Sequence, residues 1–178
     1  MFAEHQHRPA LLRPDPALAR IKLFCTDVDG VLTDGGLYYD EKGSELRRYN
    51  VLDGMGLKRL QAIGVRVCII TQSATGAITS RGERLGVDYC FTGVDDKLPR
   101  YRQLLDELAL TPDETSHIGD DVNDLELLQA VGVAVTVPAA TAPVLRACRF
   151  ITAKGGGNGA VREFAEAILE SRLRWPVA

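Results

Sequence analysis

The chain has 178 residues, of which 46% are hydrophobic and 25% are charged, and its formal net charge is −3. This length is enough for one domain with a single core, and the slightly acidic balance argues against a nucleic-acid-binding surface, which is usually basic. No stretch approaches the roughly 18 apolar residues of a membrane span, and the first residues lack the apolar core of a secretory signal. We therefore expect a cytoplasmic protein that binds neither nucleic acid nor membrane.

The cysteines and histidines do not form a metal-binding pattern. The four cysteines include no C-x-x-C pair and lie in or beside apolar stretches, as reduced buried thiols do. Two histidines lie within the first seven residues and the third stands alone, so their spacing argues against a zinc site. We interpret the adjacent pair Arg47-Arg48 as a solvated face rather than a phosphate-binding patch.

An amino-terminal tail precedes the first predicted element. We expect residues 1–15 to be flexible and residues 16–178 to form a single domain. Within it, the apolar run from Ile21 to Thr26 predicts a buried strand. That strand delivers Asp27 at its carboxyl end.

The next segment is predicted to leave the sheet. Two extended stretches, residues 37–39 and 45–49, flank a turn signal at residues 40–43 and indicate a β-hairpin. A helix capped by Asp53 should follow and end near Ile63, where a glycine stops it.

From residue 65 onward, predicted strands and helices alternate. Strands are expected at 65–71, 87–92, 115–119, 133–137 and 150–151, and helices at 75–85, 96–108, 122–131, 142–147 and 159–172. This alternation is typical of an α/β protein with a doubly wound, Rossmann-like parallel sheet, here with the β-hairpin as a flap. In such sheets, ligands bind beyond the carboxyl ends of the strands.

Four polar clusters lie at or just after the ends of predicted strands. They are Asp27 with Asp29, then Thr71, then Lys97, and finally Asp120 with Asp121 and Asp124. Each cluster alone has an ordinary structural explanation, such as a turn or a helix cap. All four together, in this order, indicate phosphoryl transfer.

Phosphoryl transfer uses these residue types. A carboxylate can attack phosphorus and form an aspartyl-phosphate, and a second acid two residues on can protonate the leaving oxygen and then deprotonate water. Mg²⁺ needs hard oxygen ligands, so one or two carboxylates plus the substrate phosphate suffice. A hydroxyl and an ammonium group can hold the remaining phosphate oxygens. We therefore expect Mg²⁺ as the cofactor and a small phosphorylated substrate.

These motifs resemble those of the haloacid dehalogenase (HAD) superfamily, and most closely its 3-deoxy-D-manno-octulosonate 8-phosphate (KDO 8-phosphate) phosphatase family. Three longer stretches carry the second likeness: DVDGVLTDG at residues 27–35, NVLDGMG at 50–56 and GGNGAVRE at 156–163. The likeness spans about residues 20–172. It implies a HAD fold without a cap domain and hydrolysis of a phosphorylated sugar acid in lipopolysaccharide biosynthesis.

The resemblance also implies a role for each motif residue. Asp27 would be the nucleophile and a metal ligand, Asp29 the general acid/base that also offers its backbone carbonyl to Mg²⁺, and Asp120 the third protein ligand. Thr71 and Lys97 would bind the transferring phosphate, while Asp121 and Asp124 would orient metal-bound water or the lysine. The remaining substrate contacts would be Asn50, Asp53, Gly54, Lys58, Arg81, Asn123 and Arg162. Of these, Arg81 is the expected partner of the carboxylate or hydroxyls of the sugar acid.

The motif spacing leaves no room for a cap domain. Thr71 follows Asp27 by 44 residues, which the hairpin and one helix fill, and Lys97 follows Thr71 by 26 residues. A small substrate must then be enclosed in another way, because a dry site strengthens electrostatic interactions. The family assembles tetramers for this purpose, so the resemblance implies a homotetramer in which the hairpins pack together and Arg162 reaches a neighbouring site.

One position departs from the family pattern. After Thr71 the family usually continues Gly-Arg, whereas this chain reads Gln72-Ser73. Unless Arg66 or Lys58 replaces the lost cation, the case for KDO 8-phosphate itself weakens, and a nine-carbon keto-deoxy acid 9-phosphate or another sugar phosphate stays open. Two further classes are a receiver-like switch and a non-catalytic domain that serves in assembly. Asp29 disfavours the switch, because a second acid accelerates hydrolysis of the phosphoryl group.

Overall fold

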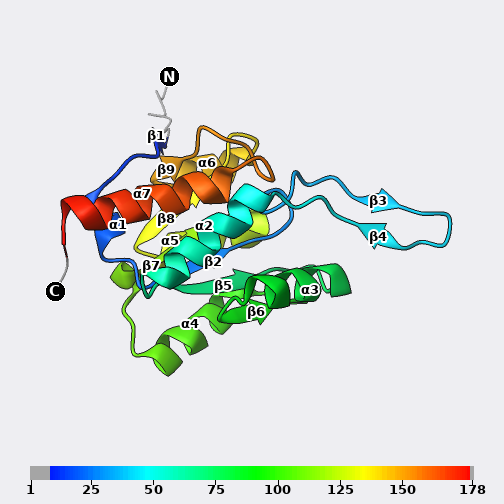
Figure 1. The fold of residues 1–178 in the computed structure, drawn as a ribbon, viewed down its shortest axis with the longest axis horizontal. Helices are drawn as coiled ribbons and strands as arrows, with labels where there is room; N and C mark the ends of the chain where they lie inside the picture. Colours follow the sequence, from blue (N-terminus) through cyan, green and yellow to red (C-terminus); the bar gives the residue numbers. More distant parts are fainter. Residues whose placement is uncertain (1–8, 177–178) are drawn as a thin grey trace, which may run out of the picture.

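The computed structural model describes residues 9–176, which are built around a seven-stranded parallel sheet (Figure 1). The strands lie in the order β1-β9-β8-β7-β2-β5-β6. In the same spatial order, their bounds are Ala10–Leu11, Phe150–Ile151, Val133–Thr136, Thr115–Ile118, Leu23–Thr26, Arg66–Ile70 and Tyr89–Phe91.

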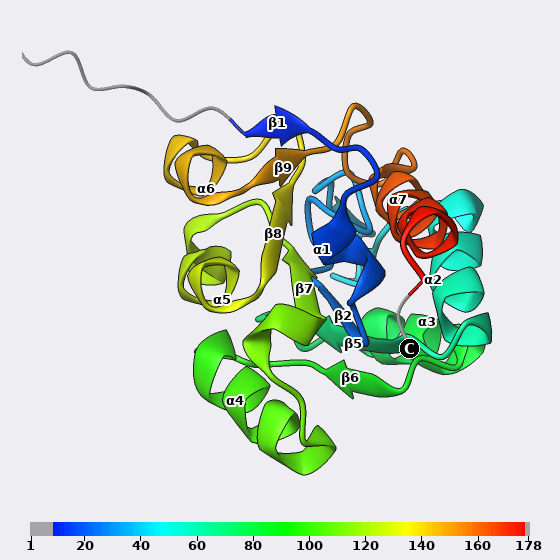
Figure 2. The same cartoon turned by 90° about the vertical axis from the view of Figure 1, so that its left-hand side faces the viewer.

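Helices cover both faces of this sheet (Figure 2). One face carries α1 (Pro16–Ala19), α2 (Val51–Ala62), α3 (Gly76–Leu85) and α7 (Ala160–Arg174), and the other carries α4 (Lys97–Leu108), α5 (Leu125–Ala130) and α6 (Ala142–Ala147). Short 3-10 turns at Pro112–Glu114 and Val122–Asp124 precede β7 and α5. Layers on both faces explain why the central strands are buried along their whole length. The predicted doubly wound α/β fold is confirmed.

The centre of the sheet brings distant parts of the chain together. Strand β2 pairs with β5 on one side and with β7 on the other, and all three run parallel. Their carboxyl ends therefore lie at one edge, at the point where the chain changes direction across the sheet. The segments that follow β2, β5 and β7 begin with Asp27, Thr71 and Gly119.

The predicted hairpin is present and projects from the body of the protein (Figure 1). It pairs β3 (Tyr38–Tyr39) with β4 (Glu45–Leu46) in antiparallel fashion. Its apolar side chains are exposed to solvent: Leu37 by 45%, Tyr38 by 56%, Tyr39 by 62% and Leu46 by 62%. The hairpin therefore has a large uncovered apolar surface.

Two sequence predictions differ from the structure in part. The flexible tail was predicted over residues 1–15; residues 1–8 lie outside the described part of the chain, while Ala10 and Leu11 form β1 and pair with β9 at the sheet edge. The cap of α2 is Asn50, whose side chain accepts a hydrogen bond from Leu52 N at 2.9 Å, and Asp53 lies within the first helical turn. Asparagine caps a helix as well as aspartate does, so residue type alone did not show whether Asn50 or Asp53 was the cap.

No helix within residues 9–176 has the length and apolar character needed to cross a membrane.

Candidate active site

The loop after β2, residues 27–33 (the β2 loop), is shaped by a buried threonine and a glycine. Thr33 Oγ1 accepts hydrogen bonds from the backbone N–H groups of Gly30 at 3.3 Å and Gly35 at 3.2 Å. Gly30 has φ +82°, and a Cβ there would lie 2.0 Å from Asp120 Oδ2. Glycine is therefore required at this position, because it lets the Asp120 carboxylate approach the β2 loop closely.

A buried lysine joins the acid at the end of β2 to the acidic loop after β7. Lys97 Nζ lies 2.9 Å from Asp27 Oδ1 and 2.7 Å from Asp124 Oδ1, and the lysine side chain is only 1% exposed. His117 Nε2 lies 2.7 Å from the same Asp124 oxygen. The other oxygen of Asp124 accepts from the backbone N–H of Asp120 at 3.3 Å. Burial of an ammonium group requires such partners, and they hold it beneath Asp27.

The carboxylates of this cluster differ strongly in their affinity for protons. Burial, followed by repulsion from Asp124, raises the pKa of Asp27 to about 6. Burial, followed by repulsion from Asp27 and Asp124, raises the pKa of Asp120 to about 7. Burial would also raise the pKa of Asp124, but His117 and Lys97 outweigh it and lower the value to about 2. Asp27 and Asp120 thus form an acidic pair that a further cation would stabilise.

The geometry of the cluster suits a hard divalent cation. One carboxylate oxygen from each of Asp27, Asp120 and Asp124 lies within 4.8 Å of the other two. The contact of Lys97 with Asp27 Oδ1 is an ion pair without the angles of a hydrogen bond, so this buried oxygen has no hydrogen-bond donor within the described residues. Because both oxygens of Asp124 already accept hydrogen bonds, Asp27 and Asp120 are the better placed ligands for Mg²⁺.

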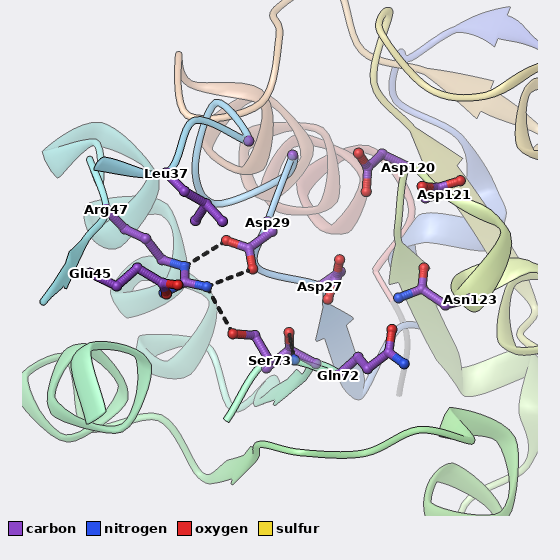
Figure 3. Close-up of a pocket in the computed structure, with 13 residues that line it drawn as sticks. Asp27, Asp29, Leu37, Glu45, Arg47, Gln72, Ser73, Asp120, Asp121 and Asn123 are labelled. Carbon is purple, nitrogen blue, oxygen red and sulfur yellow. Dashed lines mark hydrogen bonds and ion pairs between the residues drawn. The ribbon is translucent and has the colours of Figure 1, made fainter. Parts of the chain in front are cut away.

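These acids open into a pocket of about 490 Å³ (Figure 3). The structure brings six of the predicted site residues to its wall: Asp27, Asp29, Thr71, Asp120, Asp121 and Asn123. Lys97 and Asp124 lie behind this wall, in contact with Asp27 and with each other. The pocket wall also includes Gln72, Ser73 and Glu45.

Arg47 is a pocket residue that the sequence analysis placed on a solvated face. Its side chain is 2% exposed and binds both oxygens of Asp29, with Nε 2.7 Å from Oδ1 and Nη2 3.1 Å from Oδ2. It also donates to Ser73 Oγ and Thr75 Oγ1, each at 2.8 Å, and to Glu45. The sequence held one signal for this position of Arg47. Side chains alternate along an extended strand, so Arg47 lies on the same side as Glu45, which also lines the pocket.

The comparisons with known proteins agree with this site. A family model described as haloacid dehalogenase-like hydrolase matches residues 91–164. The 3-deoxy-D-manno-octulosonate 8-phosphate phosphatase of Yersinia pestis is 38% identical over 151 residues, which are 85% of this chain and 81% of that protein. This chain belongs to the KDO 8-phosphate phosphatase family. Membership makes it a HAD-type phosphoric monoester hydrolase, as the motifs predicted.

Solved structures of the family share the fold closely. The enzyme of Moraxella catarrhalis, solved in complex with magnesium ion, phosphate ion and KDO, superposes with a TM-score of 0.85 at 37% identity, covering 87% of this chain and 89% of that one. The cobalt-bound enzyme of Haemophilus influenzae gives 0.84 at 34% identity, covering 88% and 91%. Both structures hold a divalent cation on the same fold.

Three of the predicted substrate contacts have structural partners instead of positions on the pocket wall. Asn50 caps α2 and donates from Nδ2 to Gly157 O at 3.3 Å. Asp53 is 1% exposed, and its carboxylate accepts from Gly159 N at 3.2 Å and Arg162 N at 2.9 Å, so it caps α7 from a neighbouring helix. The side chain of Arg162 pairs with Glu166 at 2.6 Å. The family's NVLDGMG stretch thus binds the start of α7 here.

The predicted contacts Gly54, Arg81 and Lys58 also lie away from the pocket wall. Gly54 packs against Arg81, since a Cβ on it would lie 2.6 Å from Arg81 Nη2. Arg81 donates to a backbone carbonyl at the start of α2 and lies over the ring of Tyr49, 5.4 Å from its centroid. Lys58 and Arg66 are exposed and do not line the pocket, so neither replaces the cation missing at Ser73. The guanidinium of Arg47 lies beside Ser73 instead and donates to its Oγ.

Proposed function

We propose that this protein is a Mg²⁺-dependent phosphatase that hydrolyses KDO 8-phosphate through an aspartyl-phosphate on Asp27. The observation that carries the proposal is the arrangement of the acidic cluster. Asp27 and Asp120 line one pocket, and the buried ammonium group of Lys97 lies beneath Asp27. The Moraxella catarrhalis relative, which holds magnesium, phosphate and KDO, supports both the metal and the sugar.

The proposed reaction assigns a task to each of five motif residues: Asp27, Asp29, Thr71, Lys97 and Asp120. An oxygen of Asp27 attacks phosphorus as the bond from phosphorus to the sugar oxygen breaks, and Asp29 gives that oxygen its proton. Water then attacks the phosphorus, gives a proton to Asp29 and releases Asp27. Thr71 and Lys97 hold phosphate oxygens during both steps. Mg²⁺, bound by Asp27, Asp120 and the Asp29 carbonyl, would neutralise the repulsion between the nucleophile and the phosphate.

Alternative functions find less support. The likenesses favour KDO 8-phosphate over a nine-carbon acid phosphate, because the relatives are phosphatases of the eight-carbon ester. A non-catalytic assembly domain would have no need for two acids with raised pKa values beside a buried lysine. A receiver-like switch would not carry an acid in the place of Asp29.

We also propose that the protein acts in the cytoplasm as a homotetramer. The exposed apolar residues of the hairpin support such an assembly, because solvent-exposed patches of this kind mark contact surfaces. Arg162 would then reach a neighbouring site, which requires it to leave Glu166. The mass of the protein in sedimentation at micromolar concentration tests the assembly. A monomer with full activity would contradict the proposed homotetramer.

The function is tested by a screen of sugar phosphates with Mg²⁺. We expect phosphate release from KDO 8-phosphate and a loss of at least about three orders of magnitude in Asp27→Asn. Asp113→Asn, an exposed aspartate in the turn before β7, is the matched control and should keep wild-type activity. Comparable turnover by Asp27→Asn would refute the role of the nucleophile.

A further inference from the structure

Arg47 links three separate parts of the chain at one side of the pocket. It extends from the hairpin and donates hydrogen bonds to the β2 loop at Asp29 and to the segment between β5 and α3 at Ser73 and Thr75. It is the one cationic side chain on the pocket wall within residues 9–176. Figure 3 shows its guanidinium directed at Asp29, on the side away from Asp120.

The contact with Asp29 is the strongest kind of side-chain pair. Two parallel N–H groups of Arg47 meet the two oxygens of one carboxylate, an arrangement that fixes direction as well as distance. The Arg47 side chain is 2% exposed, whereas that of Asp29 is 34% exposed. The rigid, buried partner therefore determines where the more accessible carboxylate points.

Such a pair leaves Asp29 able to react. A carboxylate has about four lone-pair sites, and the fork of Arg47 occupies only two of them. Each oxygen of Asp29 thus keeps one free site, and in Figure 3 the carboxylate lies between Arg47 and Asp27. The carboxyl group can carry a proton on one oxygen while the other still accepts from Arg47.

We propose that Arg47 is a positioning residue for the reaction: its fork holds the Asp29 carboxyl group at the place where the sugar oxygen leaves phosphorus. This inference rests on the proposed function. In the step concerned, the Asp29 O–H bond breaks, its proton moves to the leaving oxygen, and the bond from that oxygen to phosphorus breaks as the bond from Asp27 forms. Proton transfer of this kind depends steeply on placement, because the oxygen must lie within hydrogen-bond reach of the leaving atom.

A pair of substrates with different leaving groups tests the inference. A sugar alkoxide needs a proton to depart, whereas p-nitrophenolate is a weak base and departs without one. The ratio kcat/KM reports the step in which the leaving group departs and not the later attack of water, which both esters share. Arg47→Met should therefore lower kcat/KM on KDO 8-phosphate by at least about 100-fold and lower kcat/KM on p-nitrophenyl phosphate by less than about 10-fold. Equal losses on both esters would overturn the inference.

A double-mutant cycle with Asp29 sharpens the test. If Arg47 acts through Asp29, then Asp29→Asn combined with Arg47→Met should be about as slow on KDO 8-phosphate as Asp29→Asn alone. Multiplying losses would show that the two residues act independently and would contradict the proposal. If wild-type protein hydrolyses neither ester, the proposed function fails; if it hydrolyses both and the losses multiply, only this inference fails.

Conservative and neighbouring variants separate positioning from folding. Arg47→Lys keeps the charge without the fork and should show the same preference for p-nitrophenyl phosphate, to a smaller degree. Ser73→Ala removes one anchor of the guanidinium and should do likewise, so the test does not depend on Arg47→Met folding. Arg48→Met is the matched control, because Arg48 is exposed and pairs with Asp34 outside the pocket. It should leave the ratio of the two activities unchanged.

Discussion

Asp53 offers a quantitative test, because the resemblance predicts a substrate contact and the structure shows a buried helix cap. Its carboxylate accepts from two backbone N–H groups at the start of α7, those of Gly159 and Arg162. A hydrogen bond to a charged group contributes about 1.5–3 kcal/mol. Burial raises the pKa of Asp53, so the ionised group is itself costly and the lower end of that range applies. We expect Asp53→Ala to lower the free energy of unfolding by about 3 kcal/mol, and Asp53→Asn, which keeps one acceptor oxygen, by about half as much.

Thermal and urea unfolding followed by circular dichroism measure this loss. At about 2–4 °C per kcal/mol for a domain of this size, the Tm of Asp53→Ala should fall by about 6–12 °C. The KM for the sugar phosphate, measured well below the Tm, should stay within about twofold of wild type. Arg59 lies on the exposed side of α2, the helix that holds Asp53, and pairs with Glu166. Arg59→Ala should lower the free energy of unfolding by under about 1 kcal/mol, since surface ion pairs contribute little. An unchanged Tm together with a raised KM would refute the structural role of Asp53.

Three further predictions concern the cluster and the loop. Lys97→Met leaves two buried carboxylates without their cation and should cost about 3–5 kcal/mol in urea unfolding and abolish phosphate release; wild-type stability would contradict it. Burial and repulsion from neighbouring carboxylates raise the pKa of Asp27 to about 6 and that of Asp120 to about 7. The folded metal-free protein therefore keeps protons that the unfolded chain has lost, and its Tm in EDTA should fall as pH rises from about 4 to 7. Added Mg²⁺ should then raise the Tm more at pH 8 than at pH 5, and an equal rise at both would count against a site on these acids. In Gly156→Ala, the new Cβ would lie 1.8 Å from a backbone oxygen of the β2 loop, so we expect a loss of about 1–3 kcal/mol and a lower kcat, whereas Gly155→Ala meets only one amide nitrogen at 3.9 Å and should be neutral in both assays.

Much of the fold follows from local pattern. Alternating apolar strands and helices predict the parallel sheet, because only helices on both faces can bury strands such as Leu23–Thr26 on both sides. Parallel strands then bring their carboxyl ends to one edge, which is why Asp27, Thr71 and Asp120 converge although they lie far apart in the sequence. Strand periodicity and parallel topology were sufficient for that much of the site.

The remaining contacts depend on packing between segments that no local pattern relates. Asp53 lies at the start of one helix, yet it caps another that begins more than a hundred residues later. Arg47 follows a hairpin strand, and whether its side chain meets solvent or Asp29 depends on how the hairpin leans on the body. His117, read as an isolated histidine, binds Asp124 only because β7 places it below the acidic loop. In each case the residue type allowed both outcomes, and tertiary structure decided between them.

Acid quenching during turnover tests the central claim most directly. With KDO 8-phosphate labelled in its phosphoryl group and Mg²⁺ present, quenched protein should carry the label on the peptide that contains Asp27, and the label should vanish on a chase with unlabelled substrate. Omitting the metal should abolish both the label and phosphate release. Steady release of labelled phosphate with no label on Asp27 at any quench time would contradict the account.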